Sequence, residues 1–146
     1  MTIRLLVTDD HELVRAGLVN YLGMTPGIEV VAEAASGTEL LEKLRSTSAD
    51  LLLLDMTMPG ISGEELIGRI KESYPDLPIL VLSMHNEIPF VMRVMSAGAS
   101  GYISKERPPQ VLLEAIRQTI KTGKYLHPAM AEQMEYADAS ADPDGS

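Results

Sequence analysis

The sequence predicts an α/β domain in which a doubly wound parallel sheet of five strands is covered by five helices. Leucines fill positions 51–54 and lead into Asp55, a few residues before the turn-forming pair Pro59-Gly60. An apolar run this short, closed by turn residues, indicates a strand that is buried on both faces. Four other β-rich segments alternate with helical segments along the chain, a pattern that favours parallel strands joined by helical crossovers.

The first half of the chain contains two strand and helix pairs before the leucine run. Residues 3–8 form an apolar, β-rich segment, and residues 13–22 place apolar side chains on one helical face. Glycine and a Pro-Gly pair end this helix before a second strand at residues 28–34. Capping residues then precede a short amphipathic helix at residues 40–44.

The second half continues the alternation after the leucine run. Apolar residues recur at helical spacing over residues 66–74, and prolines close this helix before a strand at residues 79–83. A looser helix at residues 90–95 is followed by a strand at residues 102–105. The last helix covers residues 109–120, and the proline at its start suits a first-turn position.

Composition limits the classes of protein that the chain can belong to. Its 146 residues suit one domain with its own core, and it has no cysteine for disulfides or thiolate metal sites. The formal net charge of -9 repels nucleic-acid phosphates, which argues against DNA binding by this chain alone. There is no signal peptide and no apolar run near the roughly 20 residues that span a bilayer, so we expect a soluble, cytoplasmic protein.

The character of the sequence changes near its C-terminus. Residues 128–136 are compatible with another helix, whereas residues 137–146 are small and acidic with no large apolar side chain. Such a composition is typical of disordered segments because it cannot bury enough apolar surface to fold. We therefore expect a folded domain over residues 1–124 and a linker over residues 125–146, partly helical and then disordered.

Polar side chains stand at the ends of four predicted strands. They are Asp9, Asp10, Asp55, Ser83 and Lys105. Because the carboxyl ends of parallel strands share one edge of a sheet, we expect these side chains to converge. Each has an ordinary explanation on its own, such as a turn or helix cap for the aspartates, a backbone partner for Ser83 and solvation for Lys105.

The combination of these residues points to a specific chemistry. Three carboxylates at one crevice repel one another and stay ionised only if a cation lies among them, and Mg²⁺ prefers oxygen ligands of this kind. A hydroxyl and a lysine at the same edge supply donors for phosphoryl oxygens. A metal, a nucleophilic carboxylate and phosphate-binding groups together describe phosphoryl transfer to an aspartate.

On these residues the chain resembles response-regulator receiver domains, from residue 3 to about residue 120. The residues that match the family pattern in order are Asp9, Asp10, Asp55, Ser83, Tyr102 and Lys105. The stretches at 9–18 and 97–105 further resemble the NarL/FixJ subgroup. The resemblance implies a flavodoxin-like sheet with strand order 2-1-3-4-5.

The resemblance also implies a role for each matching residue in a signalling domain that is not an enzyme. Asp55 would be the phosphoacceptor, taking its phosphoryl group from a sensor histidine kinase, with Lys105 and Ser83 at the same site. The groups implied to bind Mg²⁺ are Asp9, Asp10, Asp55 and the backbone carbonyl of Thr57. Ser83 and Tyr102 would switch a docking or homodimerisation surface after phosphorylation.

Members of the NarL/FixJ subgroup usually carry a C-terminal helix-turn-helix domain, through which DNA contact would occur. Such a domain needs about 60 residues, and the sequence stops after the expected linker. Two explanations stay open. The chain is either a piece of a transcription regulator, which the acidic tail favours, or a stand-alone receiver that signals by docking to other proteins.

Three rival classes fit the sequence less well. A haloacid-dehalogenase-type phosphatase needs a second acid two residues after its nucleophile, where this chain has Thr57. A flavodoxin-like FMN protein would cradle phosphate in the first strand-helix loop, where the carboxylates at 9–10 would repel it. An inactive receiver-like interaction module would lack an acid or the lysine. His11, His85 and His127 lack metal-ligand spacing, and we interpret them as ordinary polar residues.

Overall fold

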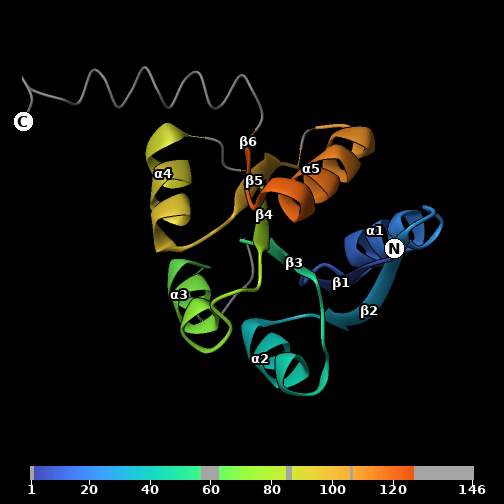
Figure 1. The fold of residues 1–146 in the computed structure, drawn as a ribbon, viewed down its shortest axis with the longest axis horizontal. Helices are drawn as coiled ribbons and strands as arrows, with labels where there is room; N and C mark the ends of the chain where they lie inside the picture. Colours follow the sequence, from blue (N-terminus) through green and yellow to red (C-terminus); the bar gives the residue numbers. More distant parts are fainter. Residues whose placement is uncertain (1, 57–62, 85–86, 106, 127–146) are drawn as a thin grey trace, which may run out of the picture.

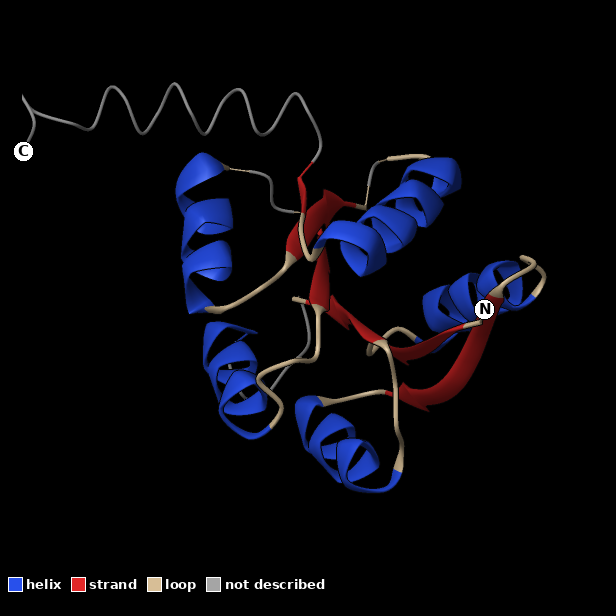
Figure 2. Ribbon diagram, viewed as in Figure 1, coloured by secondary structure: helices blue, strands red, loops and turns tan. Residues whose placement is uncertain are grey.

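The computed structural model describes residues 2–56, 63–84, 87–105 and 107–126. Within these ranges strands and helices alternate along the chain (Figure 2). The strands are β1 (Ile3–Thr8), β2 (Ile28–Ala34), β3 (Leu51–Asp55), β4 (Ile79–Ser83), β5 (Gly101–Ser104) and β6 (Tyr125–Leu126). The helices are α1 (Glu12–Gly23), α2 (Gly37–Ser46), α3 (Gly63–Ser73), α4 (Ile88–Ala97) and α5 (Pro109–Thr122).

The strands form one parallel sheet with helices on both faces. The strand order is β2-β1-β3-β4-β5-β6, which confirms the predicted order of the first five strands. Helices α1 and α5 lie on one side of the sheet, and α2, α3 and α4 lie on the other (Figure 1). Successive side chains of β1 and β3 enter the two cores in turn, so that Leu5 and Leu53 pack with α1 and α5 while Leu6 and Leu52 pack with the other helices.

Strand β3 is the centre of the sheet, as the leucine run predicts. All of its residues are buried, and it pairs with β1 on one side and β4 on the other. Thr8 is in register with Leu54, and Asp55 is in register with Leu82. The strands therefore end at nearly the same level, which brings the residues that follow them to one edge.

Strand β6 is a feature that the sequence analysis did not predict. Tyr125 and Leu126, assigned there to the linker, pair in parallel with Gly101 and Tyr102 of β5. The close approach requires glycine at position 101, because a Cβ there would lie 2.7 Å from the carbonyl oxygen of Tyr125. Two residues are too few to produce a recognisable strand pattern in the sequence. The space beside Gly101 is what allows β6 to pair with β5.

Helix α1 packs against the sheet along only part of its apolar side. Leu22 is fully buried, whereas Leu13 is 86% exposed and Val14 is 53% exposed. Leu13 and Val14 border a groove between α1 and the start of α5. No helix in the described part of the chain is both long enough and apolar enough to cross a lipid bilayer.

Candidate functional site

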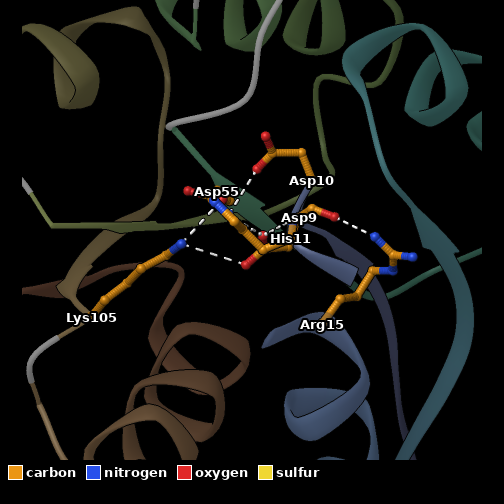
Figure 3. Close-up of polar contacts among 6 residues, drawn as sticks. All are labelled: Asp9, Asp10, His11, Arg15, Asp55 and Lys105. Carbon is orange, nitrogen blue, oxygen red and sulfur yellow. Dashed lines mark hydrogen bonds and ion pairs between the residues drawn. The ribbon is translucent and has the colours of Figure 1, made fainter. Parts of the chain in front are cut away.

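The strand ends bring the predicted polar residues to one edge of the sheet. Asp9 directly follows β1, Asp55 ends β3, Ser83 ends β4 and Lys105 directly follows β5. Asp9 and Asp55 are each only 1% exposed, and Ser83 is fully buried. Figure 3 shows the side chains of Asp9, Asp10 and Asp55 grouped together, with Lys105 reaching toward them.

Lys105 bridges two of the buried carboxylates. Its Nζ lies 3.0 Å from Oδ2 of Asp55 and 3.4 Å from Oδ2 of Asp9. The lysine side chain is itself mostly buried, so little water screens these two ion pairs. One ammonium group therefore offsets part of the repulsion between Asp9 and Asp55.

The ionisation of Asp9 reflects this crowding. Burial raises the pKa of Asp9 above its ordinary value, and the charge of Asp55 raises it further. The backbone N–H of His11, which donates to Oδ1 of Asp9 over 2.8 Å, and the charge of Lys105 lower the pKa again. The net direction is upward, so Asp9 holds a proton more readily than an ordinary aspartate does.

The site contains a set of atoms that fits a divalent cation. Asp9, Asp10, His11 and Asp55 each offer one ligand atom, and these atoms all lie within 4.8 Å of one another. Oδ1 of Asp10 is shielded from solvent, and it accepts no hydrogen bond from any residue that the structure describes. A shielded carboxylate oxygen without a hydrogen bond is costly, and a bound hard cation would remove that cost.

Two residues of the site were missed by the sequence analysis. His11 places Nδ1 3.1 Å from Oδ1 of Asp10 and 3.5 Å from Oδ1 of Asp9. Arg15 donates from its guanidinium to the backbone carbonyl of Asp9 over 2.6 Å (Figure 3). It also donates to the Glu33 carboxylate over 3.2 Å. The signal for His11 was its position directly after two aspartates, whereas the contact of Arg15 with Asp9 depends on how α1 leaves β1.

Ser83 and Tyr102 lie on the neighbouring strands β4 and β5. Burial raises the pKa of Tyr102, while the nearby Ser83 side chain lowers it and the charge of Glu87 raises it. The Tyr102 ring is 1% exposed and meets the ring of Phe90 edge to face, with ring centroids 6.4 Å apart. The Tyr102 ring therefore points inward in this structure.

Two residues considered in the sequence analysis lie outside the described residues. They are Thr57, whose backbone carbonyl was expected to bind Mg²⁺, and His85. The remaining predicted site residues all lie within the described ranges. Asp9, Asp55 and Lys105 are in direct contact, and Asp10 joins them through the candidate ligand set.

The chain belongs to the response regulator receiver domain family, which it matches over residues 5–117. It is a receiver domain of the two-component response regulators and groups with NarL/FixJ-like members, as the sequence analysis predicted. Receiver domains are signalling domains rather than enzymes of the usual kind. The acidic group at Asp9, Asp10 and Asp55 can hold a metal, as described above.

Relatives of known identity match most of this chain. It is 42% identical over 132 residues to the response regulator UvrY of Escherichia coli K12, an alignment that covers 90% of this chain and 61% of UvrY. It is 38% identical over 132 residues to the response regulator GacA of Pseudomonas aeruginosa PAO1, covering 90% of this chain and 62% of GacA. The chain thus spans about three fifths of the length of these relatives.

Solved structures share the fold. A LuxR-family two-component response regulator from Aurantimonas sp. SI85-9A1 superimposes with a TM-score of 0.88 at 33% identity, covering 95% of this chain and 99% of that one. The isolated receiver domain of RcsB from Salmonella enterica serovar Typhimurium, with the phosphomimetic BeF₃⁻, has a TM-score of 0.83 at 28% identity. That superposition covers 90% of this chain and 98% of the RcsB domain.

Proposed function

We propose that Asp55 accepts a phosphoryl group from a phosphohistidine of a sensor histidine kinase. The observation that carries this proposal is the position of Asp55, which is a buried carboxylate at the end of the central strand with the Lys105 ammonium 3.0 Å away. In parallel α/β sheets this edge is the ligand-binding edge. Asp9 and Asp10 face the same position from the neighbouring strand end.

Each residue at the edge has a part in this transfer. A carboxylate oxygen of Asp55 attacks phosphorus, so that an O–P bond forms while the N–P bond to the kinase histidine breaks. Asp9, Asp10 and Asp55, together with the backbone carbonyl expected from Thr57, which lies outside the described residues, would hold Mg²⁺, and the ion would neutralise charge on the transferring oxygens. Lys105 pairs with a phosphoryl oxygen, and the Ser83 hydroxyl donates to another.

The phosphorylated site then changes a surface that other proteins read. Engagement of Ser83 pulls on its neighbour Tyr102, whose ring packs against Phe90 of α4. The surface formed by α4, β5 and α5 is therefore the one that docks or dimerises. RcsB, a structural neighbour at 28% identity, forms dimers bound to DNA, and we infer that this receiver likewise controls a DNA-binding output.

The organisation of the chain follows from this function. We infer that the receiver extends past the predicted boundary at residue 124 to residue 126, because β6 pairs with its sheet, and that the predicted linker is the segment that follows, which lies outside the described residues. In the alternative, the receiver stands alone and signals by protein docking. A sensor kinase delivers its phosphoryl group inside the cell, so we place this receiver in the cytoplasm.

The test is mass spectrometry after incubation with acetyl phosphate, with and without Mg²⁺. Wild type should gain the mass of one phosphoryl group only when Mg²⁺ is present, and peptide mapping should place it on Asp55. An Asp55→Asn protein should gain none, whereas the matched control Asp50→Asn should label like wild type. Equal labelling of Asp55→Asn, or labelling without metal, contradicts the proposal.

A further inference from the structure

We propose that His11 is a nitrogen ligand of the metal site and shifts its preference from Mg²⁺ toward first-row transition cations such as Ni²⁺. This inference deepens the proposed function and rests on metal binding by Asp9, Asp10 and Asp55. Carboxylates alone favour hard cations such as Mg²⁺. An imidazole among them changes the class of ion that the site binds best.

The imidazole of His11 lies close to the carboxylates that are the other candidate metal ligands. Nδ1 of His11 is 3.1 Å from Oδ1 of Asp10 and 3.5 Å from Oδ1 of Asp9. The ligand atoms of these three residues and of Asp55 all fall within 4.8 Å of one another. Figure 3 shows the contacts from His11 to both aspartates beside Asp55, on the side of the cluster away from Arg15.

The contact between His11 and Asp10 is not a hydrogen bond. Oδ1 of Asp10 is shielded from solvent and accepts no hydrogen bond from the described residues, although Nδ1 is only 3.1 Å away. Nδ1 of His11 and Oδ1 of Asp10 thus lie about as close together as two ligands of one cation lie.

The backbone holds His11 in place without using its side chain. His11 is the N-cap residue of α1, with extended dihedrals, and its backbone N–H donates to Asp9 over 2.8 Å. The imidazole makes no capping hydrogen bond to the helix. The His11 side chain is 62% exposed, so a hydrated ion can reach it from solvent. The imidazole is thus available to a metal, and its removal takes no cap from α1.

The chemistry of the ligand atoms determines which ions bind more tightly when His11 is a ligand. Imidazole nitrogen suits Ni²⁺, Co²⁺ and Zn²⁺, whereas Mg²⁺ dehydrates reluctantly and takes oxygen ligands. A bond from Nδ1 therefore strengthens binding of the transition cations and adds little for Mg²⁺. The three carboxylates remain sufficient for Mg²⁺, so the site holds either class, with Ni²⁺ bound at the lower concentration.

The test measures metal affinity by displacement of Mn²⁺, using protein without a histidine tag. Free Mn²⁺ gives a sharp EPR signal that is lost when the ion binds the protein. Mg²⁺ or Ni²⁺ that displaces bound Mn²⁺ restores this signal, and the concentration needed to restore it gives the affinity of each ion. Because loss of even an outer-shell partner lowers metal affinity by about 10–100-fold, His11→Ala should weaken Ni²⁺ binding by about tenfold or more. Its Mg²⁺ affinity should stay close to that of wild type.

A spectroscopic readout separates direct ligation from an indirect effect. Electron spin-echo modulation of bound Mn²⁺ should show an imidazole ¹⁴N coupling in wild type and in the control variants His85→Ala and His127→Ala. The coupling should be absent from His11→Ala. A coupling that persists in His11→Ala, or Mg²⁺ and Ni²⁺ affinities that fall equally, overturns the assignment of His11.

The outcomes also distinguish this inference from the proposed function. If wild type binds neither Mg²⁺ nor Mn²⁺, the metal site itself fails and the inference fails with it. If Asp10→Asn weakens Mg²⁺ binding while His11→Ala binds Ni²⁺ like wild type, the metal site stands and only the role of His11 is wrong.

Discussion

The ammonium group of Lys105 lies 3.0 Å from Oδ2 of Asp55 and 3.4 Å from Oδ2 of Asp9, so one lysine serves two buried carboxylates. Removing it takes the ammonium partner away from both of these buried acids. The cost of leaving buried charge unpaired is about 3–5 kcal/mol.

We therefore expect Lys105→Met to lower the free energy of unfolding by about 3 kcal/mol in the presence of EDTA, near the lower end of that range because the lysine is partly exposed. Mg²⁺ should restore more stability to the variant than to wild type, since a cation that binds only the folded state stabilises it by mass action. Urea unfolding with and without Mg²⁺ measures both effects. The exposed Lys124→Met is the control, and equal stability of all three proteins in EDTA contradicts the prediction.

The raised pKa of Asp9 predicts how stability depends on pH. An acid whose pKa is higher in the folded state binds more protons folded than unfolded, so its contribution is greatest at low pH and is lost as pH rises through the folded-state pKa. The window begins near the ordinary pKa of aspartate, about 3.9.

Metal-free Asp9→Asn should therefore be more stable than wild type at neutral pH, and the difference should shrink as the pH falls through this window. Unfolding in urea at a series of pH values in EDTA measures the difference. The exposed Asp76→Asn serves as the control. A difference between Asp9→Asn and wild type that grows as the pH falls would refute the sign of this linkage.

The contacts of Arg15 predict that this residue affects metal affinity although it is not itself a candidate ligand. Its guanidinium holds the carbonyl of Asp9 over 2.6 Å and Glu33 over 3.2 Å, which fixes the loop that carries Asp9 and Asp10. Arg15→Gln should weaken Mg²⁺ binding by about tenfold, the lower end of the usual effect of losing an outer-shell partner. Titration calorimetry measures the affinity, and Arg69→Gln, in an exposed pair with Glu65, should bind like wild type.

The inward position of the Tyr102 ring determines which changes we expect to measure after phosphorylation. Because the ring is already buried against Phe90, beryllofluoride with Mg²⁺ should shift the NMR signals of Tyr102, Met92 and Met95 without a large change in the exposure of the ring. The exposed Met24 on the far side of the sheet should not shift. If Ser83→Ala accepts phosphate and shows the same shifts and self-association as wild type, the signal does not pass through this hydroxyl.

The close packing around Gly101 allows a local test of the pairing between β5 and β6. A Cβ at position 101 would lie 2.7 Å from the Tyr125 carbonyl oxygen and 2.8 Å from Cδ1 of Leu80. Gly101→Ala should cost about 1–3 kcal/mol of stability through overpacking. It should also accelerate hydrogen exchange of the Tyr125 amide, which donates to Ser100 in wild type.

Gly68 provides the matched control for this substitution. It lies inside α3 with no atom within 4 Å of the added Cβ, so Gly68→Ala should instead raise stability by about 0.5–1 kcal/mol. Slow exchange of the Tyr125 amide in Gly101→Ala would show that β6 tolerates the added methyl group.

The parts of the fold that the sequence predicts are those set by local pattern. The leucines of 51–54 could only be a strand buried on both faces, and parallel strands then forced Asp55, Ser83 and Lys105 to the same edge. The alternation of strands and helices predicted a parallel sheet, whereas the order of its first five strands was implied by the resemblance to receiver domains. The convergence of the site was therefore predictable without coordinates.

The features that the sequence analysis missed depend on contacts between distant segments. Strand β6 depends on the space beside Gly101, and the role of Arg15 depends on the angle at which α1 leaves β1. The edge-to-face contact of the Tyr102 ring with Phe90 joins β5 to α4. No local pattern in the chain encodes any of these three contacts.

Strand β6 also bears on how this domain avoids aggregation. An exposed sheet edge presents unpaired N–H and C=O groups that other chains can extend into a larger sheet. β6 pairs with two residues of β5, Gly101 and Tyr102, and is itself only two residues long. The chain thus covers the first two of the four residues of β5 with a strand that is too short to act as a template for other copies.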